Sequence, residues 1–195
     1  MIWAPAVKLF PLKAKVGQFR ITEGPDAGQQ REYKLEADGP SRWKLILTGV
    51  RIVYLQQNAD GSIGIRGEDE YEDNVAVRYD PPLIALPAIL VLGKTYQSQG
   101  KMVVTVLDTG APREKGTCKL AITLLRREKV NIDGQIIETF HVQGKRDIRL
   151  QWASVQVDAV TDYALDRGPV RDQLKQVTRI LGFPSRKSEG LIMLN

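Results

Sequence analysis

The stretch Asn74-Val75-Ala76-Val77-Arg78-Tyr79 places Val75, Val77 and Tyr79 on one side of the backbone and the other three residues on the opposite side. Side chains of a β-strand alternate between two faces, so this period of two predicts a strand with one buried face. The same alternation recurs further along the chain, at Met102, Val104 and Val106 and at Leu120, Ile122 and Leu124. We therefore expect a protein built from β-strands.

Turn sequences separate the expected strands at short intervals. Asp38-Gly39, Asn58–Gly61 and Asp133-Gly134 lie between apolar stretches and carry the residue types that tight hairpins require. Their spacing is typical of an antiparallel meander. The expected fold class is mainly β, with an antiparallel sheet curved into a half-barrel or incomplete barrel.

A short pattern occurs twice, first at Leu9–Gly17 (LFPLKAKVG) and then at Ala85–Gly93 (ALPAILVLG). In each copy an apolar residue precedes a proline, and a glycine follows six residues later. Proline fixes its own φ and cannot donate to a strand ladder, whereas glycine permits a bulge or a tight bend. We infer two similar entries into the sheet. The chain is then a single domain, residues 1–195, with two similar halves at about 1–80 and 81–195.

The segment Pro169–Leu181 departs from this pattern. Its apolar residues follow a helical period, with proline at the first helical position and Gly182 just past the end. A strand fits less well, because Asp172 and Gln176 would then share the face of the apolar residues Val170 and Leu174. Local rules therefore favour one C-terminal helix.

Composition places the chain among ordinary globular proteins, with 195 residues of which 43% are hydrophobic and 26% charged. Cys118 is the only cysteine, which excludes an intrachain disulfide and a multi-cysteine metal site. Residues 1–5 lack the basic and apolar regions of a signal peptide, which indicates a cytoplasmic protein or one that has been processed. The longest apolar run, Leu83–Leu92, is too short to cross a bilayer, and we expect a soluble protein.

The net charge is +5, and the excess lies in residues 112–195, which hold 15 basic and 10 acidic residues. Basic residues form no run longer than two, so a solvated surface is favoured over nucleic acid as a partner. Arg42-Trp43-Lys44 mixes basic and aromatic residues, as single-strand binders do. However, Trp43 shares a period of two with Leu45 and Leu47, which favours a core position.

Nothing in the sequence favours catalysis. His141 is the only histidine and would have to act as the base of a Ser-His-Asp or Cys-His arrangement. No nucleophile elbow or cysteine signature surrounds His141 or Cys118. A solvent-facing histidine and a structural cysteine are favoured, and we expect neither an enzyme nor a cofactor.

The cluster Glu68–Asp73 offers oxygens that a hard cation prefers, but it lacks the spacing and the central glycine of a calcium loop. A solvated loop, or a charged edge that discourages strand pairing, is favoured instead. We expect no metal site here.

The run Leu83–Leu92 contains no polar residue, so it must be covered on both sides. Two interpretations remain open. The run crosses the core between the two halves, which the pattern favours, or it lines an apolar cavity.

The proline-to-glycine pattern, with Gly93–Tyr96 after its second copy and Tyr79–Leu83 before it, resembles the TapB-like family of bacterial envelope lipoproteins. Related proteins look like lipoprotein-carrier half-barrels. Glu138–Phe140 and Tyr163–Val170 are similar to later strands of that family.

The chain also departs from the family. Tyr96 and Arg20 stand where the family pattern has a tryptophan, and the cysteine of a lipobox is missing. The resemblance implies a curved antiparallel sheet, a periplasmic or cell-envelope location and no known catalysis. It also implies a strand, rather than a helix, at Val170–Leu181.

The leading hypothesis is a non-catalytic envelope binding protein that holds an apolar small molecule or a lipid moiety against a concave sheet. The alternative is a structural or assembly subunit that buries the same apolar run against a protein partner, and peripheral membrane association is compatible with both. The residues expected to line the ligand site are Trp43, Leu86, Ile89, Leu90, Leu92 and Trp152.

Overall fold

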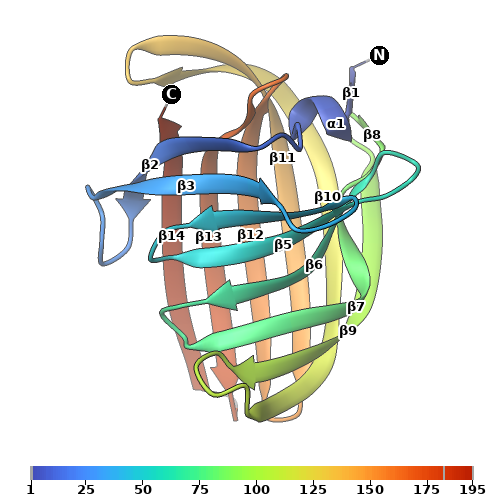
Figure 1. Ribbon diagram of the computed structural model, residues 1–195, viewed down its shortest axis with the longest axis vertical. Helices are drawn as coiled ribbons and strands as arrows, with labels where there is room; N and C mark the ends of the chain where they lie inside the picture. The colour runs from blue at the N-terminus through green and yellow to red at the C-terminus, as the bar shows by residue number, and fades with distance from the viewer. Residues whose placement is uncertain (1, 182, 195) are drawn as a thin grey trace.

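The computed structural model describes residues 2–181 and 183–194 (Figure 1). Its elements run in the order β1 (Trp3–Pro5), α1 (Ala6–Leu9), β2 (Lys15–Glu23), β3 (Gln30–Ala37), β4 (Arg42–Leu47), β5 (Arg51–Gln57), β6 (Ile63–Glu70), β7 (Val75–Leu86), β8 (Ile89–Val91), β9 (Thr95–Val106), β10 (Pro112–Ile132), β11 (Gln135–Leu150), β12 (Ala153–Ala164), β13 (Gly168–Ile180) and β14 (Phe183–Leu194).

In the described part of the chain, twelve antiparallel strands close into one barrel (Figure 1). Strands β2 to β7 follow one another around the wall, and strands β9 to β14 continue from them. The two sets meet where β7 pairs with β9 and where β14 pairs with β2. Short hairpins permit this order, because antiparallel neighbours need only a tight turn between them. The predicted mainly β, antiparallel fold is confirmed, but the sheet closes completely instead of forming a half-barrel.

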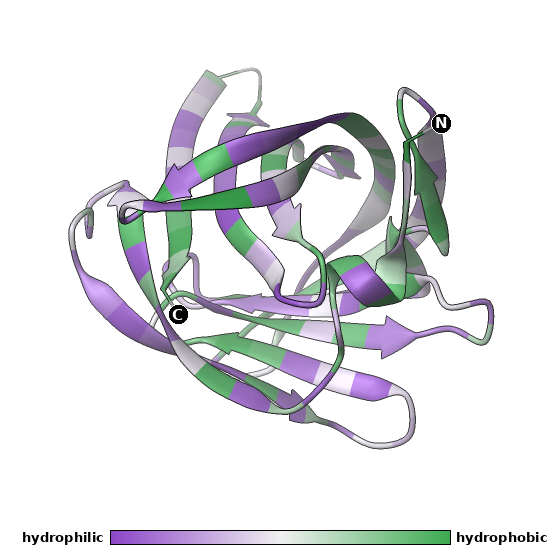
Figure 2. Cartoon of the chain, turned by 90° about the horizontal axis from the view of Figure 1, so that it is seen from above, coloured by the Kyte–Doolittle hydropathy of each residue, from purple (hydrophilic) through white to green (hydrophobic). Residues whose placement is uncertain are grey.

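The apolar run Leu83–Leu92 leaves the barrel wall after Leu86. After β7, the strand β8 pairs with β1 outside the barrel, as both ribbon views show (Figures 1 and 2). The first copy of the proline-to-glycine pattern runs into β2 and the second ends just before β9, but their glycines act differently. Gly93 occupies a turn at φ +75°, whereas Gly17 lies inside β2, where a Cβ would come 2.6 Å from the ring of Tyr33.

The prediction of a helix at Pro169–Leu181 is wrong, because Gly168–Ile180 forms strand β13 between β12 and β14. The objection to a strand was that Asp172 would share a face with Leu174. Both residues do line the same interior cavity, and this arrangement is stable because Asp172 has polar partners there. Within the described residues, no helix combines the length and apolar character that a membrane span requires.

Two clusters of buried apolar residues fill the barrel, and a third lies under the long β10–β11 hairpin. This hairpin extends beyond the barrel rim and curls back toward β14 and β2 (Figure 1). Val130, Ile132 and Ile137 of the hairpin pack against Ala164 and Val170. The hairpin therefore covers the outer side of the wall at one end of the barrel.

Candidate functional site

The barrel interior contains an open cavity of about 160 Å³ between β4–β6 on one side and β11–β14 on the other. One part of its wall is apolar, formed by Leu45, Val53, Leu55, Ile63, Ile65 and Leu86. The other part is polar, formed by Arg51, Glu68, Arg146, Thr161 and Asp172. A cavity of about 150 Å³ can accept a molecule the size of benzene. The site therefore fits a small apolar group with a polar atom at one end.

Arg51 stands at the centre of the polar part. Its guanidinium nitrogens lie 3.6 Å from carboxylate oxygens of Glu70, Asp172 and Glu189, which come from three different strands. These distances are those of ion pairs rather than of direct hydrogen bonds. A guanidinium has five N–H donors, so Arg51 can also donate to a polar group placed in the cavity.

A second buried ion pair lies beside the first. Nη1 of Arg146 is 2.6 Å from Oε1 of Glu68. Lys187 adds a third cation, with Nζ 2.8 Å from Glu189 and 2.6 Å from Glu72. Buried charges are stable only when they are paired. The polar interior therefore depends on this network of ion pairs.

The network holds four interior carboxylates, those of Glu68, Glu70, Asp172 and Glu189, against the cations of Arg51, Arg146 and Lys187. Burial raises the pKa of Glu70 to about 7, despite the attraction of Arg51. Burial opposes the charge of Arg51, but its carboxylate neighbours, Glu70 first among them, raise its pKa overall. Glu70 is therefore the interior carboxyl group that takes up a proton near neutral pH.

The structure disperses the six residues expected to line the ligand site. Leu86 lines the interior cavity, and Trp43 packs at the edge of the same core cluster. Leu90 is fully buried, but Ile89 and Leu92 of the same run are 51% and 40% exposed. Trp152 is 63% exposed, in the turn between β11 and β12. Only Leu86 therefore touches the cavity.

The charged lining was not predicted from the sequence, because charged side chains usually face solvent. The acidic cluster was expected to be a solvated loop or edge, yet Glu68 and Asp69 are buried within β6. The alternation of side chains along the strands does indicate this charged lining. Arg51 shares the period-two face of Val53 and Leu55, and Arg146 shares that of Ile148. Charged residues in the apolar phase of several strands indicate a polar interior.

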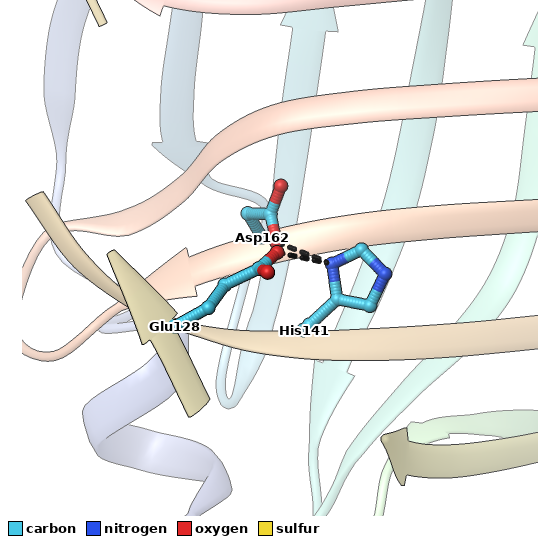
Figure 3. A group of neighbouring side chains, drawn as sticks. All are labelled: Glu128, His141 and Asp162. Carbon is cyan, nitrogen blue, oxygen red and sulfur yellow. Dashed lines mark hydrogen bonds and ion pairs between the residues drawn. The ribbon is translucent and has the colours of Figure 1, made fainter. Parts of the chain in front are cut away.

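A second candidate site lies on β10, β11 and β12 near the start of the curled hairpin. Figure 3 shows Glu128 and Asp162 converging on one ring nitrogen of His141. Nδ1 of His141 is 2.7 Å from Oδ1 of Asp162 and 3.1 Å from Oε1 of Glu128. His141 is 8% exposed, so the expectation of a solvent-facing histidine is wrong.

These three side chains could each offer one ligand atom to a metal ion, since the atoms lie within 4.8 Å of one another. Two arginines already balance the carboxylates. Arg171 donates from Nε to Asp162 at 2.6 Å, and Arg126 donates from Nε to Glu128 at 2.7 Å. With its charges compensated by arginine, the cluster fits a structural role, which is to fasten the hairpin to the barrel wall.

Cys118 and His141 do not meet. The register pairs His141 with Arg126, far along β10 from Cys118, whose side chain is fully buried in the barrel core. Burial raises the pKa of the Cys118 thiol to about 11. Because the thiolate is the reactive form of cysteine, Cys118 is a structural residue, as expected.

Comparisons with known proteins give a fold but no family. No protein-family model matches the chain, and no curated protein matches it. The chain is similar to the solved structure of the hypothetical lipoprotein YmcC from Escherichia coli K12, with a TM-score of 0.51 and 10% identity over 98% of this chain and 89% of that one. A putative lipoprotein from Parabacteroides distasonis gives a TM-score of 0.48 and 11% identity over 95% of this chain and 96% of that one. The likeness to YmcC shows that the two chains share a fold.

Proposed function

We propose that this chain is a non-catalytic binding protein of the bacterial cell envelope. Its barrel holds an apolar group, such as the end of a lipid chain or another small apolar molecule. The observation that carries the proposal is the interior cavity, which apolar side chains such as Leu55 and Ile65 line together with the charged Arg51. A ligand pocket typically combines an apolar wall with a few polar groups that fix orientation.

The envelope location rests on the shared fold with YmcC, which is described as a hypothetical lipoprotein. Membership in the TapB-like family is part of the same proposal and is supported by the proline-to-glycine pattern. The cavity limits the ligand. At about 160 Å³ it accommodates one thin apolar group and not a whole lipid.

Native mass spectrometry of the purified protein, followed by solvent extraction, tests the proposal. We expect a discrete adduct that is released as an apolar molecule, and uptake of a fluorescent apolar probe that saturates at one per chain. Leu55→Trp fills the cavity and should abolish both signals. Val103→Trp places the same side chain on a 41% exposed position of β9 and should change neither. Equal binding by both variants, or a parent protein that binds nothing, would sink the proposal.

The second candidate function is a structural or assembly subunit, and the small β1–β8 sheet favours it. Trp3 pairs with Val91, and Pro5 pairs with Ile89. Trp3 and Ile89 are 55% and 51% exposed, so the outward face of this sheet is apolar. A subunit would show a mass that rises with concentration in sedimentation, and Ile89→Ser would reverse that rise without affecting ligand uptake.

A further inference from the structure

The β11–β12 and β13–β14 turns lie at the end of the barrel away from both chain termini (Figure 1). Four residues at these turns are exposed and apolar. Trp152, Ile180, Leu181 and Phe183 are 63%, 55%, 72% and 79% exposed. They belong to two neighbouring turns. The backbone N–H of Leu181 donates to the carbonyl of Trp152 at 3.3 Å, and Ile180 pairs with Phe183 across the β13–β14 hairpin. These four residues form one surface, which we call the apolar tip.

The fold does not require apolar residues at these positions. Hairpin turns ordinarily carry glycine, asparagine or aspartate, which accept left-handed backbone and are well solvated. Leu181 instead adopts φ +50° while its side chain points into solvent. For a residue with a branched side chain this conformation is unfavourable. A leucine that is both strained and exposed indicates a role outside the folded chain.

Positive charge surrounds the apolar tip. Residues 173–186 contain three basic residues and no acidic one. Arg149, Arg179 and Arg186 are exposed on the strands that lead into the two turns. Arg179 donates to the neutral Gln156, so its charge is not cancelled by that contact. Two acidic groups lie nearby, Asp147 at 3.6 Å from Arg149 and Glu114, which accepts from the backbone N–H of Trp152.

We propose that the apolar tip docks this protein on the surface of an anionic lipid bilayer. Trp152, Leu181 and Phe183 enter the interfacial region, where amphipathic and apolar side chains partition favourably. The arginines around them meet the lipid phosphates, which attract basic side chains near the surface. Charge complementarity selects this occupant, because a rim in which exposed arginines outnumber the acidic groups matches the negative charge of an anionic bilayer. Docking by the tip is independent of ligand binding inside the barrel.

Tryptophan fluorescence distinguishes the two ends of the barrel. The chain has three tryptophans, so Trp3→Phe with Trp43→Phe leaves Trp152 as the reporter, and Trp43→Phe with Trp152→Phe leaves Trp3. Each protein is added to vesicles of equimolar phosphatidylcholine and phosphatidylglycerol with brominated acyl chains. We expect quenching of Trp152 and none of Trp3. Vesicles of phosphatidylcholine alone should give weaker binding.

Variants of the tip complete the test. Leu181→Asn keeps a residue type that accepts φ +50°, and together with Phe183→Ser it should weaken vesicle binding at least about tenfold. Arg179→Gln and Arg186→Gln should each weaken it about fivefold. Ile136→Ser, at a 72% exposed position of the opposite hairpin, is the control and should change nothing.

Binding that persists in the tip variants, quenching of Trp3 instead of Trp152, or no binding to anionic vesicles would each overturn the docking proposal. A protein partner at the tip would give the last of these results. Circular dichroism of each variant shows that the fold is retained. The adduct in native mass spectrometry is measured without vesicles, so failure of one proposal leaves the other standing.

Discussion

Asp162 and His141 are in direct contact beneath the β10–β11 hairpin, with Oδ1 and Nδ1 2.7 Å apart. Asp162 is 1% exposed, and its second oxygen accepts from Arg171. One carboxylate on β12 thus connects the hairpin strand β11 with β13. Beyond this region the hairpin lies outside the ring of barrel strands. Its position therefore depends on side-chain contacts such as these.

Replacing this carboxylate should therefore loosen the hairpin. Asp162→Ala leaves Arg171 and His141 without their buried partner, and we expect a loss of about 3 kcal/mol in the free energy of unfolding, measured in urea. Glu138→Ala removes an ion pair with Arg127 on the same hairpin, where both side chains are nearly half exposed. That control should cost less than about 1 kcal/mol. Equal losses in the two variants would contradict the role given to Asp162.

The raised pKa of Glu70 predicts a pH dependence. The usual glutamate pKa is 4.5, and burial raises it to about 7 in the folded protein. Between these values the folded chain holds a proton that the unfolded chain releases. This contribution to stability is complete below about pH 4.5 and is lost as the pH rises through about 7.

Glu70→Gln removes the titrating group while keeping a polar side chain next to Arg51. The parent protein should lose about 2 kcal/mol relative to this variant between pH 5 and pH 8. Urea titrations of both proteins at the two pH values measure the difference. A constant difference across this range would show that Glu70 is ionised throughout.

Two residues of the same apolar run should respond differently to truncation. Leu86 is 1% exposed and lines the cavity, whereas Ile89 is 51% exposed on β8. Leu86→Ala should lower the free energy of unfolding by about 3 kcal/mol, because it removes buried contacts and enlarges a cavity. Ile89→Ala should cost less than about 1 kcal/mol. Thermal unfolding of the two variants ranks them, and a larger loss for Ile89→Ala would mean that β8 is covered in solution.

Two glycines that face a neighbouring strand should also differ in how much stability is lost when each is replaced by alanine. A Cβ on Gly116 would come 2.2 Å from the carbonyl oxygen of Arg149, which the strand pairing holds in place. A Cβ on Gly144 would meet the ends of two side chains that can move, Ile122 at 3.3 Å and Leu120 at 4.0 Å. Gly116→Ala should cost more than about 2 kcal/mol, whereas Gly144→Ala should change stability by less than about 1 kcal/mol. Denaturation curves with equal midpoints would contradict this account.

The strands were predictable because hydrophobic alternation is a local property. Val75, Val77 and Tyr79 alternate within one strand, and Asp133-Gly134 forms the turn that was expected. Closure of the barrel was not predictable, because the pairing of β14 with β2 joins residues that are remote in the sequence.

The interior was mispredicted for a different reason. Pattern rules assign charge to the solvent side of a strand, and Asp172 in β13 was therefore used as an argument for a helix. In the barrel, Asp172 faces Arg51 of β5 from the opposite part of the wall. Only the closed sheet brings these two strands together, so the partner that stabilises Asp172 cannot be identified from its own segment.

The pairing of β14 with β2 also sets the order of assembly. Around the ring, most neighbouring strands are joined by a short turn, but β14 and β2 are joined only by hydrogen bonds between their backbones. During synthesis, one edge of β2 stays unpaired until β14 has been made, which is when nearly the whole chain has emerged. An unpaired edge is a template for other strands, so this seam is the place where the nascent protein is most exposed to aggregation. A circular permutant that links these two strands covalently and opens another hairpin would move that vulnerability elsewhere in the ring.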